Sequence, residues 1–333
     1  MNPPLLPMLG AGVATGALAT WSARFLARRL GIVSHPNPIV PQHTGTIAYL
    51  GGMAVAAGAV GALALGGAPS RALIGGRLDL IVGASLFLAL GVVDDLRPLR
   101  PLSKFLAQAC FAAVAVRLRL DPGADALHLL WYALSVGWIL TVVNAVNLTD
   151  VCDGLVAGLA IIQLAVLSFL VPADGPWALA MAAACMGFLL FNAPPATIFL
   201  GDAGSHLLGF CLAILTLDLV GNDHRFPSVA QAILVAGVPL FELIFLVAVR
   251  ARKGLPWWRG SPDHFSLRLQ AAGYTRWEAD FLAWAVMLLL AAVALGVGDG
   301  GRWMIVAVGG AVGTLGIWCW RYLGRHEVPG PLA

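Results

Sequence analysis

Two amides, a hydroxyl and two carboxylates lie within one short stretch between apolar runs of membrane-spanning length. They are Asn144, Asn147, Thr149, Asp150 and Asp153. The two asparagines are three residues apart, as are the two aspartates, so each pair can share a helical face. One Asn in a membrane helix is often only a hydrogen bond between helices. Several polar groups at a bilayer edge are costly, however, and favour a functional site.

Two adjacent carboxylates, Asp94 and Asp95, end another apolar run, and Lys104 follows them closely. Adjacent carboxylates at a membrane surface repel each other, which raises the pKa of at least one unless a cation lies nearby. The alternatives are a solvated helix end for the aspartates and an interfacial position for Lys104, with its ammonium group reaching water.

Asp202 directly follows Gly201 and lies just before a second glycine. This arrangement suits a tight turn that aims the carboxylate and leaves backbone N–H groups free. The alternative is that Asp202 caps the helix that follows.

The longest polar segment covers residues 250–279 and contains His264 and Arg268, four residues apart. Two such side chains can face one anion from a short helix. The basic and Trp residues of the segment equally suit a membrane-interface anchor.

Composition places these groups in a membrane protein. The chain has 333 residues, is 59% hydrophobic and 11% charged, and has a mean hydropathy of +0.86, whereas soluble domains carry about 25% charged residues. Because the apolar segments lack the alternation of barrel strands, we predict an all-α polytopic protein with about 11 transmembrane helices, forming one domain over 1–333. The segments lie near 5–26, 46–66, 79–93, 103–118, 127–143, 155–171, 177–193, 205–220, 228–249, 280–297 and 303–321.

Basic residues predict the orientation. With eleven spans, fourteen Lys and Arg residues share a side with the C-terminus and six lie on the other side. The positive-inside rule then places the C-terminus, the proposed site and the 250–279 substrate-binding loop in the cytoplasm, and the N-terminus outside the plasma membrane. No basic residue precedes Arg24, which argues against a cleaved signal peptide. The net charge of +3 is too small to indicate nucleic-acid binding.

This topology collects six aspartates on the cytoplasmic face: Asp94, Asp95, Asp150, Asp153, Asp202 and Asp263. Carboxylates that converge without matching lysines repel one another, and a hard divalent cation removes the repulsion. We expect Mg²⁺, with Mn²⁺ as the alternative. Because Mg²⁺ with few protein ligands typically holds substrate phosphates, the residues predict phosphoryl transfer that involves a lipid.

Four motifs, in order, resemble one known family. They are Asp94-Asp95, Asn144-x-x-Asn147-x-x-Asp150-x-x-Asp153-Gly154, Phe199-x-Gly201-Asp202-x-Gly204-Ser205 and the late segment with His264. From about His35 to Arg276, the chain resembles the polyprenyl-phosphate N-acetylhexosamine-1-phosphate transferases, which include phospho-N-acetylmuramoyl-pentapeptide translocase. The resemblance implies attack of a polyprenyl phosphate, with undecaprenyl phosphate expected, on a UDP-sugar with release of UMP. N-acetylglucosamine is the expected sugar.

The resemblance also implies residue roles. The expected metal ligands are Asp202 and Asn147. The expected catalytic groups at the metal and lipid phosphate are Asp94, Asp95, Lys104 and Asp150. The expected substrate-binding residues are Asn144, Asp153, Phe199, Gly201, His264 and Arg268. Among these, Asp153 and Phe199 are expected to hold the uracil, whereas His264 and Arg268 are expected near the diphosphate or sugar.

The chain departs from the family pattern at several positions. Val151 replaces the first glycine of Asp-Gly-x-Asp-Gly, and the late segment keeps only His264 of His-x-His-His. Tyr49-Leu50 replace a basic residue before a glycine pair, and Glu242 stands where an aspartate is more common. These differences concern the sugar and nucleotide rather than the metal and lipid-phosphate groups.

Two other functions stay open. A proton-coupled secondary transporter would use Asp218 and Glu242, which lie within apolar segments, as a relay. At membrane depth, each should face a partner inside the bundle. A degenerate family member would bind lipid or nucleotide without turnover. The sequence is also compatible with a homodimer.

Overall fold

The structure, a computed structural model, describes residues 5–34, 45–66, 76–120, 126–221, 226–256, 258–297 and 302–328. Within these ranges the fold is helical, apart from two short strands that pair antiparallel, β1 (Val33–Ser34) and β2 (Ile47–Ala48). The helices are α1 (Leu5–Leu30), α2 (Gly51–Leu65), α4 (Leu78–Leu96), α5 (Pro101–Arg119), α6 (Ala126–Thr149), α7 (Leu155–Leu170), α8 (Gly175–Asn192), α9 (Gly201–Val220), α10 (Phe226–Val235), α11 (Gly237–Arg252), α12 (Phe265–Ala271), α13 (Arg276–Val297) and α14 (Arg302–Leu323). The segment that starts the resemblance, from His35 to His43, lies outside the described residues.

Each predicted apolar segment coincides with a helix, and the segment 228–249 coincides with the pair α10 and α11. In the described chain, five helices are long and apolar enough to cross a membrane, or six if the bent pair counts as one span. The all-α polytopic fold is therefore confirmed, whereas the number of eleven spans and the orientation stay predictions.

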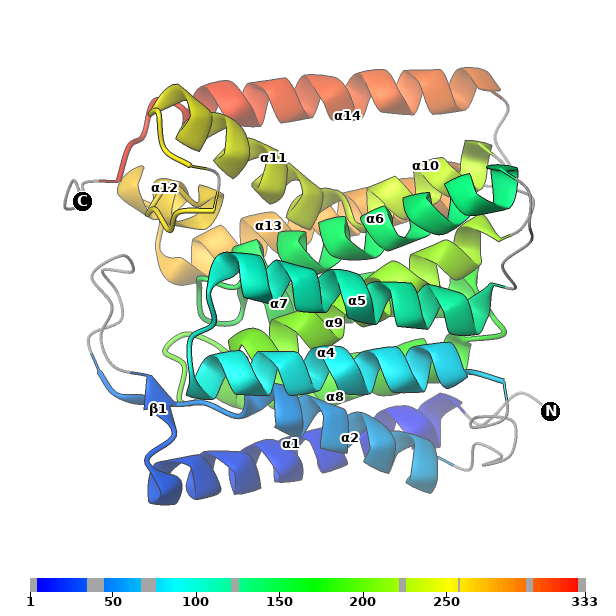
Figure 1. Cartoon of the computed structure of the whole chain (residues 1–333). Coiled ribbons are helices and arrows are strands. Elements are labelled where there is room, and N and C mark those ends of the chain that lie inside the picture. Colours follow the sequence, from blue (N-terminus) through cyan, green and yellow to red (C-terminus); the bar gives the residue numbers. More distant parts are fainter. Residues whose placement is uncertain are drawn as a thin grey trace.

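Helix α9 lies inside the bundle, where it is buried along most of its length and packs against α4, α6 and α2 (Figure 1). Gly91 permits close contact between α4 and α9, because a Cβ atom there would lie 2.3 Å from the Cα atom of Ala203. The end of α4, which carries Asp94 and Asp95, consequently lies against the first turn of α9.

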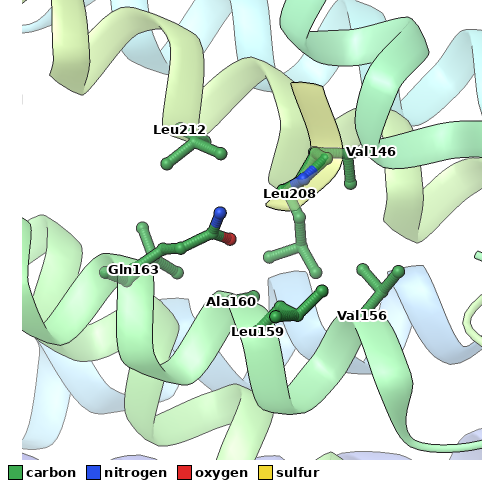
Figure 2. A pocket seen from close by; sticks show the side chains of 9 residues that line it. Val146, Val156, Leu159, Ala160, Gln163, Leu208 and Leu212 are labelled. Carbon is green, nitrogen blue, oxygen red and sulfur yellow. The ribbon is translucent and has the colours of Figure 1, made fainter. Parts of the chain in front are cut away.

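Helices α10 and α11 bend by 72° where they meet, next to Ala236. Pro239 has no backbone N–H, so the carbonyl of Val235, four residues earlier, lacks its helical donor. The side-chain Nε2 of Gln163 on α7 donates to that carbonyl at 2.8 Å. Figure 2 shows Gln163 beside a small apolar hollow that Leu208 also lines. A buried amide therefore satisfies the carbonyl that proline leaves free.

We expect Gln163→Leu to lower the free energy of unfolding by about 1–3 kcal/mol, because the buried Val235 carbonyl loses its donor. Thr141→Val is the control, since the Thr141 hydroxyl bonds the Gly137 carbonyl within an uninterrupted helix. Denaturant unfolding in detergent compares the two variants. If both variants lose the same free energy of unfolding, the break between α10 and α11 does not explain the loss in Gln163→Leu.

A network of charged residues closes the end of the bundle opposite Asp202. Its members are Arg77, Asp79, Arg119, Asp174 and Asp218. The Nη2 atom of Arg77 lies 2.9 Å from Oδ2 of Asp218, and Arg119 also contacts this carboxylate. Buried charges persist when they are paired. The prediction that Asp218 faces partners inside the bundle is confirmed.

Candidate active site

Asp95 holds the turn that begins α9. Its Oδ1 accepts the backbone N–H of Asp202 at 2.8 Å, and its Oδ2 accepts that of Ala203 at 3.1 Å. Gly201 has φ +73°, and a Cβ atom there would lie 2.6 Å from Oδ2 of Asp95. A side chain at this position would therefore be strained and would crowd the carboxylate. Asp95, rather than Asp202, satisfies the first N–H groups of α9.

The side chain of Asp202 is left free of that capping role and lies between two polar groups from other helices. Lys104 Nζ lies 2.7 Å from Oδ2 of Asp202, and Asn147 Nδ2 donates to Oδ1 at 2.6 Å. Lys104 also reaches Oδ2 of Asp94 at 2.7 Å. The Asp202 side chain is 32% exposed, against 8% for Asp94. Asp202 is therefore the more accessible of the two carboxylates that share Lys104.

These residues come from four helices. Asp94 ends α4, Lys104 lies in the first turn of α5, Asn147 near the end of α6 and Asp202 at the start of α9. Of the acidic segments predicted to converge, the one with Asp94 and Asp95, the one after Asn147 and the one with Asp202 meet at one end of the bundle, whereas Asp263 does not join them. We call Asp94, Asp95, Lys104, Asn147 and Asp202 the acidic cluster.

Asn144 lies one turn before Asn147 on α6 and belongs to a second row of polar groups. Its Nδ2 donates to Oε1 of Gln108 at 2.9 Å, and Nε2 of Gln108 lies 2.9 Å from Nε2 of His206. Gln108 and His206 are missing from the sequence prediction. The available signal is their spacing, because each lies four residues after a member of the acidic cluster and so on the same helical face.

Asp150 directly follows α6 and is partly buried. Burial raises its pKa well above the usual range, and the negative charges of Asp202, Asp95 and Asp153 raise it further. A cation bound near Asp202 would oppose this shift, because it favours the ionised carboxylate.

The raised pKa predicts how stability depends on pH. When a carboxyl has a higher pKa in the folded protein than in the unfolded chain, the folded protein loses stability as the pH rises above the pKa of the unfolded carboxyl, about 3.9 for Asp. Asp150→Asn cannot ionise, so without divalent cations it should raise Tm at pH 8 more than at pH 4. Thermal unfolding in detergent at both pH values measures this. A Tm shift independent of pH would contradict the assignment.

Asp153 and Phe199, the residues expected to hold uracil, lie in loops at the same end of the bundle. Oδ2 of Asp153 accepts the backbone N–H of Ala196 and contacts Nη1 of Arg276, each at 3.1 Å. The backbone N–H of Phe199 donates to the Ala48 carbonyl at 2.8 Å, and the Phe199 ring lies edge-on to Tyr49 with centroids 6.2 Å apart. Their role with uracil stays a prediction.

His264 and Arg268 form a separate buried network. His264 Nδ1 lies 2.7 Å from Oε1 of Glu242, and Arg268 Nη2 lies 2.6 Å from Oδ1 of Asp263. The prediction that Glu242 faces a partner inside the bundle is confirmed. Because Glu242 and Asp218 belong to different networks, the structure counts against a proton relay between them. Arg268 Nη1 also bonds the Leu323 carbonyl at 2.9 Å, so protein groups occupy both terminal nitrogens.

Asp263 does not join the acidic cluster. Burial raises the pKa of Asp263, but hydrogen bonds from Lys253 and Arg268 outweigh burial, so its pKa lies below the usual range. The segment 250–279 nevertheless contacts the loop between α6 and α7, because Cys152 Sγ lies 3.2 Å from Oγ of Ser266 on α12. The ion pairs of His264 and Arg268 therefore lie beside the loop between α6 and α7. An approach of His264 and Arg268 to the substrate stays a prediction.

The described residues contain no group of three or more His, Cys, Asp or Glu side chains arranged to hold a metal ion. In the acidic cluster, the cation that the carboxylates share is Lys104. Two groups can offer oxygen atoms once their present contacts rearrange: the partly exposed carboxylate of Asp202, which now contacts Lys104 and Asn147, and Oδ1 of Asn147 after rotation of its amide. Mg²⁺ commonly uses one or two protein ligands and completes its shell with water and substrate phosphates. Asp202 and Asn147 therefore carry oxygen atoms of the kind that Mg²⁺ binds, and binding of the ion stays a prediction.

Fold and site together define a multi-pass helical membrane protein with a cluster of carboxylates, a lysine and an amide at one end of its bundle. The family model described as "Glycosyl transferase family 4" matches residues 78–220, which include the whole acidic cluster. The chain belongs to this family, the polyprenyl-phosphate N-acetylhexosamine-1-phosphate transferases, and is thus an enzyme of a phospho-sugar transferase family.

Three relatives illustrate the similarity. The chain is 32% identical over 263 residues to "Probable undecaprenyl-phosphate N-acetylglucosaminyl 1-phosphate transferase" of Bacillus subtilis (strain 168), covering 74% of this chain and 72% of that protein. It is 30% identical over 297 residues to "Decaprenyl-phosphate N-acetylglucosaminephosphotransferase" of Mycobacterium tuberculosis (strain ATCC 25618 / H37Rv), covering 77% and 73%. It is 33% identical over 242 residues to "Phospho-N-acetylmuramoyl-pentapeptide-transferase" of Limosilactobacillus fermentum, covering 66% and 74%.

Proposed function

We propose that the protein transfers N-acetylglucosamine 1-phosphate from its UDP derivative to undecaprenyl phosphate, on the cytoplasmic face of the plasma membrane. The observation that carries this proposal is the partly exposed carboxylate of Asp202, held by Lys104 and Asn147 at one end of the membrane bundle. Such a site can meet a lipid phosphate from the bilayer and a nucleotide from water. The names of two relatives specify a polyprenyl phosphate and N-acetylglucosamine, which supports this choice over muramoyl-pentapeptide.

In the proposed reaction, an oxygen of the lipid phosphate bonds to the β-phosphorus of the UDP-sugar. The bond from that phosphorus to the oxygen bridging the α-phosphorus breaks, and UMP leaves with the electron pair. Lys104, whose ammonium group lies between the carboxylates of Asp94 and Asp202, would neutralise phosphate charge. Asp94 would accept the proton of a protonated lipid phosphate, and Asp95 would keep the α9 turn in place.

Mg²⁺ belongs to the proposal, with Asp202 and Asn147 as its protein ligands. When bound, the ion supplies positive charge that stabilises the transferring phosphoryl group. Asp150 would lie near enough to favour cation binding electrostatically, because its charge interacts with that of Asp202.

The experiment uses purified protein in detergent with undecaprenyl phosphate and a panel of nucleotide sugars, and it measures the mononucleotide released. We expect UMP from UDP-N-acetylglucosamine, loss of release with EDTA, and recovery with Mg²⁺ or Mn²⁺. Release that survives chelation would remove the metal from the proposal. No release with any donor, from protein that binds the lipid, would favour the degenerate alternative.

A further inference from the structure

A basic and aromatic hollow lies on the last two turns of α1. Its volume is about 270 Å³ and its lining residues are Trp21, Arg24, Phe25, Arg28 and Arg29. These positions follow the spacing of one helical face. The buried residues of α1, which include Met8, Thr20 and Ala27, lie on the opposite face of the helix, where α1 packs on α2 and α8. The hollow therefore faces away from the bundle.

The hollow carries positive charge, and none of the carboxylates that the structure describes pairs with it. Arg24 bonds Oγ1 of Thr197 at 3.2 Å, and the guanidinium of Arg29 lies 4.1 Å from the ring centre of Phe25. In the described part of the chain, no ion pair involves Arg24, Arg28 or Arg29, and residues 31–44 contain no acidic residue in the sequence. Unpaired cations at a membrane boundary attract anionic headgroups, each contributing about 1 kcal/mol.

The surroundings of these arginines are apolar and exposed. Trp21 is 53% exposed and Phe25 50%; Trp21 precedes all three arginines along α1, and Phe25 precedes Arg28 and Arg29. Tryptophan near a cluster of arginines is typical of the membrane interface. The hollow thus combines a site for a phosphate group with apolar rings for hydrocarbon chains.

The hollow also touches the loop that leads into the acidic cluster. Thr197, the partner of Arg24, lies two residues before Phe199. The neighbouring Ile198 forms a bridge to Ala48 of β2, which pairs with the strand that follows α1. A ligand on Arg24 would therefore act on the segment that ends at Asp202.

We propose that this hollow binds the phosphate headgroup of an anionic bilayer phospholipid, with its acyl chains beside Trp21 and Phe25. The substrate lipid is the less suitable occupant, because its phosphate must reach Lys104 on α5, and α1 packs on α2 and α8 rather than on α4 or α5. The proposal goes beyond the proposed transfer reaction and does not depend on it. If the proposal is correct, the bound phospholipid holds α1 against the loop before Phe199.

Delipidated protein in detergent, titrated with phosphatidylglycerol or phosphatidylcholine and followed by native mass spectrometry, tests this site without any substrate. Wild type should bind phosphatidylglycerol more tightly than phosphatidylcholine. Arg28→Gln should weaken phosphatidylglycerol binding about fivefold, and Arg28→Gln with Arg29→Gln roughly thirtyfold, from about 1 kcal/mol for each charge. The control Arg325→Gln removes an exposed charge after α14 and should leave affinity within twofold.

Three results would overturn the proposal. One is equal affinity of wild type for both phospholipids. Another is a double variant that elutes as folded protein yet binds phosphatidylglycerol within threefold of wild type, or that loses no more than Arg325→Gln. The third is displacement of phosphatidylglycerol by equimolar undecaprenyl phosphate, which would make the hollow a substrate site. If no transfer activity is found, the binding result still stands on its own.

Discussion

Asp202→Asn is expected to lower the rate of UMP release by at least about a thousandfold. The carboxylate is the more accessible of the two that share Lys104, and it contacts Lys104 and Asn147 at 2.7 and 2.6 Å. Removing its charge weakens the proposed Mg²⁺ site and the charge stabilisation of the transferring phosphoryl group. A loss of about 4 kcal/mol at the transition state corresponds to this factor.

The variant should still fold, because Asn has the same shape and the α9 turn depends on backbone N–H groups bound by Asp95. Glu278→Gln is the control: it removes an exposed carboxylate from the start of α13 and should leave turnover unchanged. UMP release and elution from a sizing column are measured for both variants. Wild-type turnover by Asp202→Asn would exclude a role for this carboxylate in the metal site.

The positions of the helices could be predicted from the sequence because long apolar runs in a lipid environment must satisfy their backbone groups internally. The break within residues 228–249 was not predicted, although Pro239 gives the signal. What makes the break tolerable is Gln163, a residue of another helix, and its pairing with Val235 requires the packing of α7 against α10.

Sidedness predicted that Asp94, Asp95 and Asp202 lie at the same end of the bundle, and the family resemblance added Lys104 and Asn147; sidedness also placed Asp263 with them, whereas Asp263 pairs with Lys253 and Arg268. The different contacts of the two adjacent aspartates, Asp94 and Asp95, could not be predicted from the sequence. Asp95 binds the N–H groups of α9 and Asp94 binds Lys104, which follows from the register in which Gly91 lets α4 meet α9. A metal ion was expected because the carboxylates had no matching lysines, but Lys104 lies between Asp94 and Asp202 and neutralises part of their charge.

The late segment shows a further limit of sequence reasoning. The spacing of His264 and Arg268 predicted that they face one anion. The structure gives each a different carboxylate, Glu242 for the histidine and Asp263 for the arginine. Glu242 lies in an apolar helix far from the loop in sequence, and only the tertiary arrangement reveals the pairing.

Lys104→Gln is expected to lower turnover about a hundredfold or more, because its ammonium group is the positive charge shared by Asp94 and Asp202. Without it, two carboxylates that are partly shielded from water repel each other. Removing one partner of a fully buried ion pair lowers the free energy of unfolding by about 3–5 kcal/mol. Because Asp202 is partly exposed, we expect a loss of about 2 kcal/mol here. Unfolding in detergent and UMP release are both measured.

A double variant separates structure from chemistry. Lys104→Gln with Asp94→Asn removes one of the two repelling carboxylates, so it should recover most of the lost stability. If Lys104 contacts the phosphates, activity should stay low in the double variant although the protein is stable. Recovery of activity in parallel with stability would instead show that Lys104 serves only to hold Asp94 and Asp202 together. Lys104→Arg keeps the charge but replaces a compact ammonium by a planar fork, so it should keep the fold and recover only part of the turnover.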